Sequence, residues 1–427
     1  MASKSEHICL FEDQAATHFS PLIYFRPVYN LRCGIASLRE KTLHFFPRSG
    51  YTLQCRDYLA GYMRHRNPGV LVNDIPAGRC LFINGRTVME SRLRTSLMPT
   101  GAGDVVFTSG DNVVAAWVSG EVLSRLKRNL GRLLTLEDFS GITTEEVQAD
   151  LVTYPWDLVH RNAAQLVADY RILTGKRRSP VSVASLRRRG VQVLGSDHVY
   201  VSEGVSVKPG TVLDAEDGPV YVGRDVQIFA QATIMGPASI GERSWIKVNA
   251  QIYPNTTIGP VCKVGGEVEG SIFHGYSNKQ HHGFIGHSYI GAWANLGAGT
   301  TNSDLKNNYG LVRVQTAEGV VETGQQFIGL MMGDHSKTAI NSMFNTGTIV
   351  GVSSNIFGFG FPPKYVPSFS WGAAGETFTT FNIDQAVEMA RRVMARRAIP
   401  LLEVEEKLFR TIFAITADER RLRGMPH

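Results

Sequence analysis

Residues 277–300 concentrate the side chains of this sequence whose types and spacing could do chemistry. The segment contains the run SNKQHHGFIGH over 277–287 and the run NLGAGT over 295–300. The imidazole of His281, with an ordinary pKa of about 6.5, can accept a proton near neutral pH. Backbone N–H groups in the corner formed by Gly297, Ala298 and Gly299 could donate to a developing oxyanion. A histidine of this segment, which contains His281, His282 and His287, could therefore act as a general base beside this corner.

The element that carries these groups is indicated by large aliphatic residues at every sixth position. A helix repeats its apolar residues at about 3.6 positions and an ordinary strand at 2, so neither explains a period of six. A hexapeptide period is typical of a parallel β-helix, in which each unit is a short strand and a turn. Gly after the aliphatic residue is expected to form the corners. The eight positions are Val222, Ile228, Ile234, Ile240, Ile246, Ile252, Ile258 and Val264.

The same pattern extends in both directions and predicts a β-helix over 190–370, with its coils between about 193 and 360. Two stretches, 265–283 and 302–326, break the period and are expected to be loops that leave the coils, where solenoids tend to carry their sites. The second contains Lys306 and could cover a substrate. The hits that resume the period are Phe284, Ile290, Leu296, Ile328, Ile340, Val350 and Ile356.

The first 185 residues have the alternating pattern of an α/β domain. Strands are expected at 7–11, 70–72, 80–83, 104–107 and 113–117, with helices near 35–43, 119–130 and 156–174. After the β-helix, residues 371–427 contain two amphipathic helices, the first beginning after Asn382 and the second after Pro400. We expect these helices to cap the open end of the β-helix.

Composition limits the classes of partner. The formal net charge of +6 comes from scattered Lys and Arg, which favours anionic small substrates over nucleic acid. The five Cys are widely separated without metal-type pairing, which is typical of a reducing compartment. With no leader-like start and no apolar run near about 18 residues, we expect a cytoplasmic protein that does not bind membranes.

The two runs at 277–300 resemble the acetyltransferase half of the bifunctional enzymes that make UDP-N-acetylglucosamine. In that likeness His281 stands for the general base, Phe284 for a tyrosine and Asn295 for a substrate-binding asparagine. The resemblance implies a left-handed β-helix, a homotrimer, acetyl-CoA as co-substrate at Gly297–Gly299, and a sugar phosphate as acceptor. Lys279 and Lys306 are expected to help bind that acceptor, with Lys247, Lys263 and Lys337 as other cations nearby.

The first half resembles the sugar-phosphate nucleotidyltransferases, and closest is the alternative bacterial form in which an atypical domain of this kind precedes the β-helix. The likeness rests on Pro21-Leu22, on Arg26-Pro27 and on the YPWDL run at 154–158, which resembles the segment that links the two halves. It implies a Rossmann-like domain, UTP as a possible substrate and Mg²⁺. The family's glycine-rich phosphate loop is replaced by EDQAA at 12–16. Candidate nucleotide-binding residues are Arg26, Arg32 and Arg86, and candidate metal ligands are Asp74 and Asp104.

Several alternatives remain open from the sequence. His281 could be a surface histidine, and His282 with His287 could form the zinc arrangement of the γ-type carbonic anhydrases. Arg26 and Arg32 could instead be structural partners of nearby acids. At the level of function, the alternatives are a nucleotidyltransferase whose β-helix only trimerises, and a degenerate scaffold that binds nucleotides or sugars.

Overall fold

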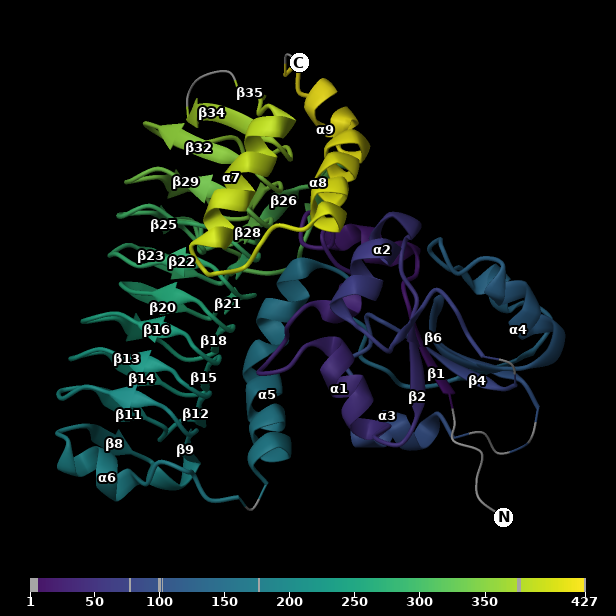
Figure 1. Ribbon diagram of the computed structural model, residues 1–427, viewed down its shortest axis with the longest axis horizontal. Helices are drawn as coiled ribbons and strands as arrows, with labels where there is room; N and C mark the ends of the chain where they lie inside the picture. The colour runs from purple at the N-terminus through teal and green to yellow at the C-terminus, as the bar shows by residue number, and fades with distance from the viewer. Residues whose placement is uncertain are drawn as a thin grey trace.

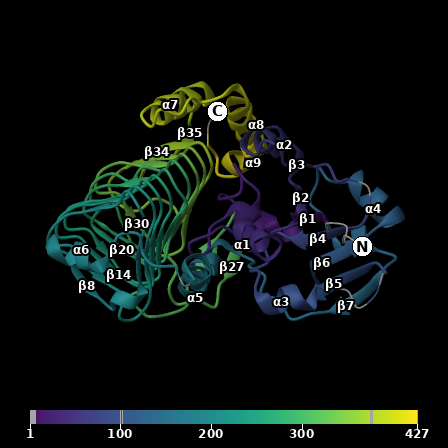
Figure 2. The same ribbon diagram turned by 60° about the horizontal axis from the view of Figure 1, so that its bottom comes forward.

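The computed structural model describes residues 7–76, 78–98, 101, 103–175, 177–374 and 378–425. An α/β domain and a long β-helix lie side by side, and the C-terminal helices lie alongside the last coils (Figures 1 and 2). Among the residues described, no helix combines the length and the apolar character needed to cross a membrane.

The α/β domain contains one mixed sheet and five α-helices. The strands are β1 (His7–Phe11), β2 (Gly50–Leu53), β3 (Leu71–Val72), β4 (Cys80–Asn84), β5 (Val105–Ser109), β6 (Asn112–Val118) and β7 (Thr143–Glu146). They are ordered β3-β2-β1-β4-β6-β5-β7, with β6 antiparallel to both neighbours. The five expected strands are confirmed, whereas β2 and β7 were not predicted.

The helices of this domain cover both faces of the sheet, as the buried parallel strands require. They are α1 (Leu38–Phe45), α2 (Asp57–Arg66), α3 (Ser91–Ser96), α4 (Gly120–Lys127) and α5 (Pro155–Thr174), with short 3-10 turns η1 (Gln14–Phe19), η2 (Val28–Asn30) and η3 (Leu136–Phe139). Helix α1 begins later than expected because Ser37 caps it: the Ser37 hydroxyl accepts from the Glu40 N–H, and the Glu40 carboxylate accepts from the Ser37 N–H at 2.7 Å.

The β-helix is left-handed, as expected, and its coils stack three parallel sheets. One contains β8 (Gln192–Leu194), β11 (Val212–Asp214), β14 (Thr233–Met235), β17 (Gln251–Ile252), β20 (Glu267–Glu269) and β23 (Phe284–Gly286). The second contains β9 (Val199–Val201), β12 (Val220–Val222), β15 (Ala238–Ile240), β18 (Thr256–Ile258), β21 (Ile272–Phe273), β24 (Tyr289–Ile290), β28 (Leu330–Met332), β31 (Thr348–Val350) and β33 (Tyr365–Val366).

The third face begins with β10 (Ser206–Val207), β13 (Gln227–Ile228), β16 (Trp245–Ile246), β19 (Lys263–Val264) and β22 (Asn278–Lys279). It ends with β29 (Lys337–Thr338), β32 (Asn355–Gly358), β34 (Ser370–Ala374) and β35 (Thr379–Thr380). A further pair, β25 (Thr301–Asn302) and β30 (Met343–Phe344), lies in the later coils. Helix α6 (Val183–Arg188) and the turn η4 (Ser196–His198) begin this half, and Leu186 packs on its core.

The hexapeptide pattern is confirmed, since all eight aliphatic side chains from Val222 to Val264 are at most 1% exposed. Ile240 pairs with Val222 below it and with Ile258 above it. The corner glycines serve close packing, because a Cβ on Gly241 would lie 2.5 Å from the carbonyl carbon of Gly259. The left-handed backbone at the corners falls on residues such as Asp225, with φ of 55°.

The expected loop at 265–283 is wrong, because this stretch is a full coil with two shortened corners. Val268 and Phe273 are fully buried core residues, spaced by fewer than six positions from their predecessors. Lys279 takes the next core position, opposite Val264 on the coil below. Ile340, expected in the core, is instead 69% exposed.

The stretch 302–326 does leave the coils, but it does not lie over a free surface. It forms a hairpin of β26 (Arg313–Gln315) and β27 (Val320–Glu322). Val312 and Val314 are fully buried in one apolar cluster with Phe19 and Trp156 of the α/β domain. The excursion therefore joins the two halves.

The C-terminal helices are α7 (Ile383–Ala395), α8 (Glu403–Ile415) and α9 (Ala417–Arg421). Asn382 caps α7, as expected, by accepting from two N–H groups of the first turn. Helix α8 packs on α2 through Leu408 and Phe409, in one cluster with Leu59 and Met63 (Figure 1). Capping of the last coil falls to other residues, since Phe378 and Met425 join the β-helix core.

Candidate functional site

The sheet edge where β1 and β4 end is the place where open α/β sheets usually bind ligands, because the strand order reverses there. In this protein it is filled by buried ion pairs. Arg86 is fully buried and holds Asp13 in two contacts, Nε to Oδ1 at 2.8 Å and Nη2 to Oδ2 at 2.6 Å. Glu12, also fully buried, accepts from the Val28 N–H and from Arg56. The prediction that Arg86 binds nucleotide is wrong, because its guanidinium neutralises Asp13.

Arg26 is likewise not available to a nucleotide. Its guanidinium forms a buried two-contact ion pair with Asp334, a residue of the β-helix, and donates to the Leu22 carbonyl at 2.9 Å. The structural alternative for Arg26 is therefore correct, although the partner comes from the other half of the chain. A contact between residues 308 positions apart could not be read from local sequence.

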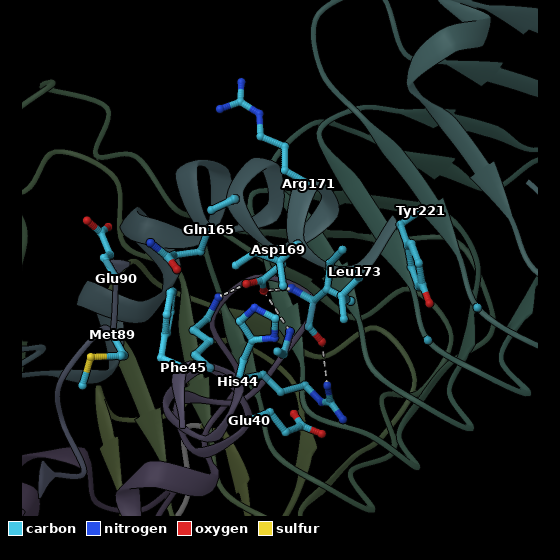
Figure 3. Close-up of a pocket in the computed structure, with 18 of the residues that line it drawn as sticks. Glu40, His44, Phe45, Met89, Glu90, Gln165, Asp169, Arg171, Leu173 and Tyr221 are labelled. Carbon is cyan, nitrogen blue, oxygen red and sulfur yellow. Dashed lines mark hydrogen bonds and ion pairs between the residues drawn. The ribbon is translucent and has the colours of Figure 1, made fainter. Parts of the chain in front are cut away.

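Arg32 lies on the wall of a cleft of about 1040 Å³ between the α/β domain and the β-helix. Its guanidinium donates to the carbonyls of Ile35 at 2.8 Å and His274 at 3.1 Å. Figure 3 shows Glu40 from α1, Asp169 from α5 and Tyr221 from β12 around this cleft.

Two carboxylates on this wall differ in environment. Asp169 forms a buried ion pair with Lys41. Burial raises the pKa of Asp169, and Lys41 opposes the rise. Burial also disfavours the charged form of Glu40, but Arg32 and the Ser37 hydrogen bonds outweigh it and lower the pKa of Glu40. Both signs of charge therefore line the cleft.

The two candidate metal ligands, Asp74 and Asp104, do not lie close enough to hold one ion together. Asp74 follows β3 and Asp104 precedes β5, so they lie five strand steps apart in the sheet, or about 24 Å. The Asp104 carboxylate instead accepts from the N–H and hydroxyl of Ser119, both at 2.8 Å. In the described part of the chain, no three His, Cys, Asp or Glu side chains gather as a metal site.

On the β-helix, His281 is exposed at a corner between β22 and β23. Lys279 was expected to bind substrate, but its side chain points into the core and is 1% exposed. Its ammonium donates to the carbonyls of Gly265 at 2.7 Å and His281 at 2.9 Å. Burial lowers the pKa of Lys279 to about 8, against the opposing effect of Glu267. Lys279 therefore holds the corner that presents His281.

The expected oxyanion donors are largely occupied. The Gly299 N–H donates to the His282 carbonyl at 3.0 Å, and the Gly297 N–H donates to the Thr338 hydroxyl at 3.0 Å. These contacts join successive coils, so neither N–H is free for a ligand. Ala298 belongs to the same ladder through its carbonyl, which accepts from the Asn341 N–H at 2.7 Å.

The other predicted residues of this half, Lys306, Phe284 and the His282/His287 pair, lie in different surroundings. Lys306 donates to the Leu311 carbonyl inside the hairpin excursion and is not among the residues that line the pocket of Asn295. Phe284 is half-buried below Thr301, whose hydroxyl accepts from the Phe284 N–H at 3.3 Å. The zinc alternative is also wrong, because His287 bonds Asp304 at 2.8 Å while His282 is exposed on the corner.

Asn295 lies in a pocket of about 240 Å³ on the outer face of the β-helix, hereafter the outer-face pocket. The coils stack Lys263, Asn278, Asn295 and Lys337 in one column. The Asn278 amide donates to the Asn295 carbonyl oxygen at 3.3 Å. Gln280, the residue before His281, lines the same pocket.

Sequence reasoning missed Asn278 and Arg397 in this pocket. Counting one coil back from Asn295 would have found Asn278, which lies 17 positions earlier. Arg397 donates to the Asn278 oxygen at 2.7 Å from beyond the end of α7. Its contribution depends on where the C-terminal helices pack, which no local pattern indicates.

Comparison with known proteins finds similarity over parts of this chain. Residues 8–178 match the family model described as "Sugar nucleotidyl transferase". An Escherichia coli protein described as "Uncharacterized acetyltransferase YaiX" is 25% identical over 156 residues, which cover 36% of this chain and 68% of that protein. "Bifunctional protein GlmU" of Bartonella quintana is 26% identical over 230 residues, covering 52% of this chain and 46% of the relative.

Another relative is the "Bifunctional sugar-1-phosphate nucleotidylyltransferase/acetyltransferase" of Sulfurisphaera tokodaii, 30% identical over 142 residues, or 33% of this chain and 35% of that protein. The chain thus spans about a third to a half of the bifunctional relatives it matches. Among solved structures, "UDP-N-acetylglucosamine acyltransferase from Campylobacter jejuni" matches 53% of this chain and 94% of that chain, with 12% identity and a TM-score of 0.26.

Proposed function

We propose that the chain is a GlmU-like transferase, which joins a sugar nucleotidyl transferase domain to a hexapeptide β-helix, and that the β-helix transfers an acetyl group from acetyl-CoA to an amino-sugar phosphate, glucosamine 1-phosphate. The observation that carries this proposal is the placement of Asn278 and Asn295 in the outer-face pocket, which is also lined by Gln280, the residue before the exposed His281.

The chemistry follows from these groups. His281 takes a proton from the sugar ammonium, and the freed amine attacks the thioester carbonyl carbon. The C–N bond forms, the C–S bond breaks, and the CoA thiolate leaves and takes up a proton. Asn278 and Asn295 offer an amide donor and acceptor that orient the sugar hydroxyls, since positioned polar groups supply specificity in such sites.

The partner that closes this site is a second copy of the chain. His281 and His282 are exposed on the side of the prism, so a neighbouring β-helix in a homotrimer would shield the thioester from water. Acetyl-CoA would lie in that cleft, close to the Gly297–Gly299 corner.

The test is thiol release from acetyl-CoA with glucosamine 1-phosphate, comparing His281→Ala with His282→Ala. Both side chains are exposed on one corner, so neither change should alter folding. We expect His281→Ala to lower the rate about 10² to 10⁴-fold, as for a positioned acid or base, and His282→Ala to leave it nearly unchanged. Equal rates for wild type and His281→Ala would remove the base from the proposal.

A second activity, uridylyl transfer from UTP to N-acetylglucosamine 1-phosphate, is favoured by the family match over 8–178. Because buried ion pairs fill the β1/β4 edge, we place this reaction in the cleft lined by Arg32, which can hold a nucleotide sugar. Mg²⁺ entering with nucleotide phosphates needs one or two protein carboxylates, and Glu40 and Glu90 on the cleft wall would hold it. Bound there, the ion would neutralise phosphate charge.

Pyrophosphate release tests this second activity. Arg32→Ala should reduce it, because the Arg32 guanidinium lines the cleft and has the largest effect of any charge on the pKa of Glu40. Activity that survives Arg32→Ala in a folded protein would place the nucleotide elsewhere.

A further inference from the structure

The outer-face pocket is unusual in its charge. Among the residues that the structure describes, its lining contains four cations, Lys263, Lys337, Arg396 and Arg397, and no acidic side chain. The other lining groups are amides, aromatic rings and one valine. In a site of this size, four uncompensated positive charges repel one another unless an anion enters.

The cations come from two parts of the chain that are far apart in sequence. Lys263 and Lys337 belong to the β-helix column, whereas Arg396 and Arg397 follow the last turn of α7. Arg397 is held there by its 2.7 Å bond to Asn278, and Val393 of α7 lines the same pocket. Figure 1 shows α7 lying along the upper coils. The C-terminal helices therefore complete a site that the β-helix begins.

The environments of Lys263, Lys337 and Arg397 disfavour the charged form of each side chain. Burial lowers the pKa of Lys337 to about 8. Burial, followed by the nearby Arg397 and Lys247, also lowers the pKa of Lys263. Arg397 is lowered by burial too, with a further effect of Arg396. Lowered pKa values show that the charged forms of these side chains are disfavoured, and a bound anion would favour them. Such perturbed groups are typical of ligand-binding sites.

Aromatic rings flank the cations. The rings of Tyr276 and Trp293, which line the pocket, stack at 4.4 Å between centroids. Lys263 lies 4.0 Å from the centroid of Trp245 on the coil below. The Trp245 ring therefore holds the Lys263 ammonium from one side. Lys337 is held instead by the His335 carbonyl, which accepts from its ammonium at 2.6 Å.

We propose that the outer-face pocket binds a phosphate or diphosphate group through Lys263, Lys337, Arg396 and Arg397. This inference rests on the proposed acetyl transfer, because either of its two substrates would bring such a group: the sugar phosphate or the diphosphate of coenzyme A. The amides of Asn278 and Asn295 then face the part of the substrate next to the phosphate. The C-terminal segment becomes part of the binding site.

The experiment is calorimetric titration of the full-length protein with inorganic pyrophosphate, at low and high salt. Arg396→Met and Arg397→Met test the site, and Arg392→Met is the matched control. Arg392 lies on the same helix and carries the same charge, but it is exposed and pairs with Glu388. We expect each site variant to weaken pyrophosphate binding about 10-fold or more, as for a charge-assisted hydrogen bond, and the control to change it less than about 2-fold.

Glucosamine 1-phosphate and coenzyme A are then titrated in competition, and the one that displaces pyrophosphate identifies the source of the group. If wild type does not bind pyrophosphate, or if Arg396→Met and Arg397→Met both bind it as wild type does, the proposal is overturned. Pyrophosphate binding that depends on these arginines, in a protein without thiol release, would refute acetyl transfer and leave the anion site standing. Because Arg396 is exposed, Arg396→Met keeps the test valid if Arg397→Met does not fold.

Discussion

Replacing Lys279 by Met should change how the stability of this protein depends on pH. Lys279 stands where the stacked coils otherwise place an aliphatic residue, opposite Val264, and is 1% exposed. Burial lowers its pKa to about 8, while the unfolded chain keeps the ordinary value. Between these two values the unfolded state binds more protons than the folded state, so the free energy of unfolding rises with pH.

The magnitude follows from the two pKa values. With about 8 in the folded chain and about 10.4 in the unfolded chain, raising the pH from about 7 to about 9.5 adds about 2 kcal/mol to the free energy of unfolding through this one group. Lys279→Met removes this contribution. At neutral pH, Lys279→Met removes a buried charge, which stabilises the folded state. The Gly265 and His281 carbonyls then lose their hydrogen-bond donor, which destabilises it, so the two effects oppose each other.

The assay is thermal unfolding of wild type, Lys279→Met and a control, Lys208→Met, at both pH values. Lys208 is exposed on an early coil. When the pH is raised from the lower to the higher value, the Tm of wild type minus the Tm of Lys279→Met should increase by about 4 to 8 °C. This follows from about 2 to 4 °C per kcal/mol for a unit of this size. The control should keep a constant offset from wild type. A constant offset for Lys279→Met as well would show that this lysine titrates normally, and the buried placement would be refuted.

Three further changes test the contacts that join and fill the two halves. Arg26→Met leaves Asp334 buried without its partner and should lower the free energy of unfolding by about 3 to 5 kcal/mol, measured as a lower Tm. The double variant Arg26→Met/Asp334→Leu should recover part of this loss. An unchanged Tm in Arg26→Met would argue against the ion pair between the halves. Arg86→Met leaves the Asp13 carboxylate without its partner and should destabilise the α/β domain by a similar amount. Chemical unfolding followed by tryptophan fluorescence measures this change. A variant that is as stable as wild type but binds UTP more weakly would instead support a nucleotide-binding role for Arg86. Val314→Asp places a charge in the cluster that joins the hairpin excursion to Phe19 and should increase proteolysis at 302–326, whereas Val320→Asp, at an exposed position of the same hairpin, should not.

The fold could be predicted from the sequence to a large extent because a period of six has one physical explanation. The coils could be counted wherever the spacing was regular, and the errors fall where it is not. At 265–283 two corners are shorter than usual, so the coil was mistaken for a loop. Lys279 was assigned to the acceptor site, whereas its side chain fills a core position where lysine is rare.

The site was harder to predict because its residues meet across coils and between separate parts of the chain. Arg26 pairs with Asp334 and Arg397 donates to Asn278, although each pair is more than 100 positions apart in the sequence. Local sequence patterns do not predict contacts over such distances. The α/β domain shows the same limit. Local sequence marks Arg86 and Asp13 as functional types, but only their mutual contact shows that they neutralise each other.

The measurement that tests the central claim most directly is a paired assay on the purified full-length protein. One arm follows thiol release from acetyl-CoA with glucosamine 1-phosphate, and the other follows pyrophosphate release from UTP and Mg²⁺ with N-acetylglucosamine 1-phosphate. The account predicts thiol release that requires the amino sugar and is lost in His281→Ala. Absence of thiol release from a folded wild-type protein would contradict acetyl transfer at the outer-face pocket, whatever the second arm shows.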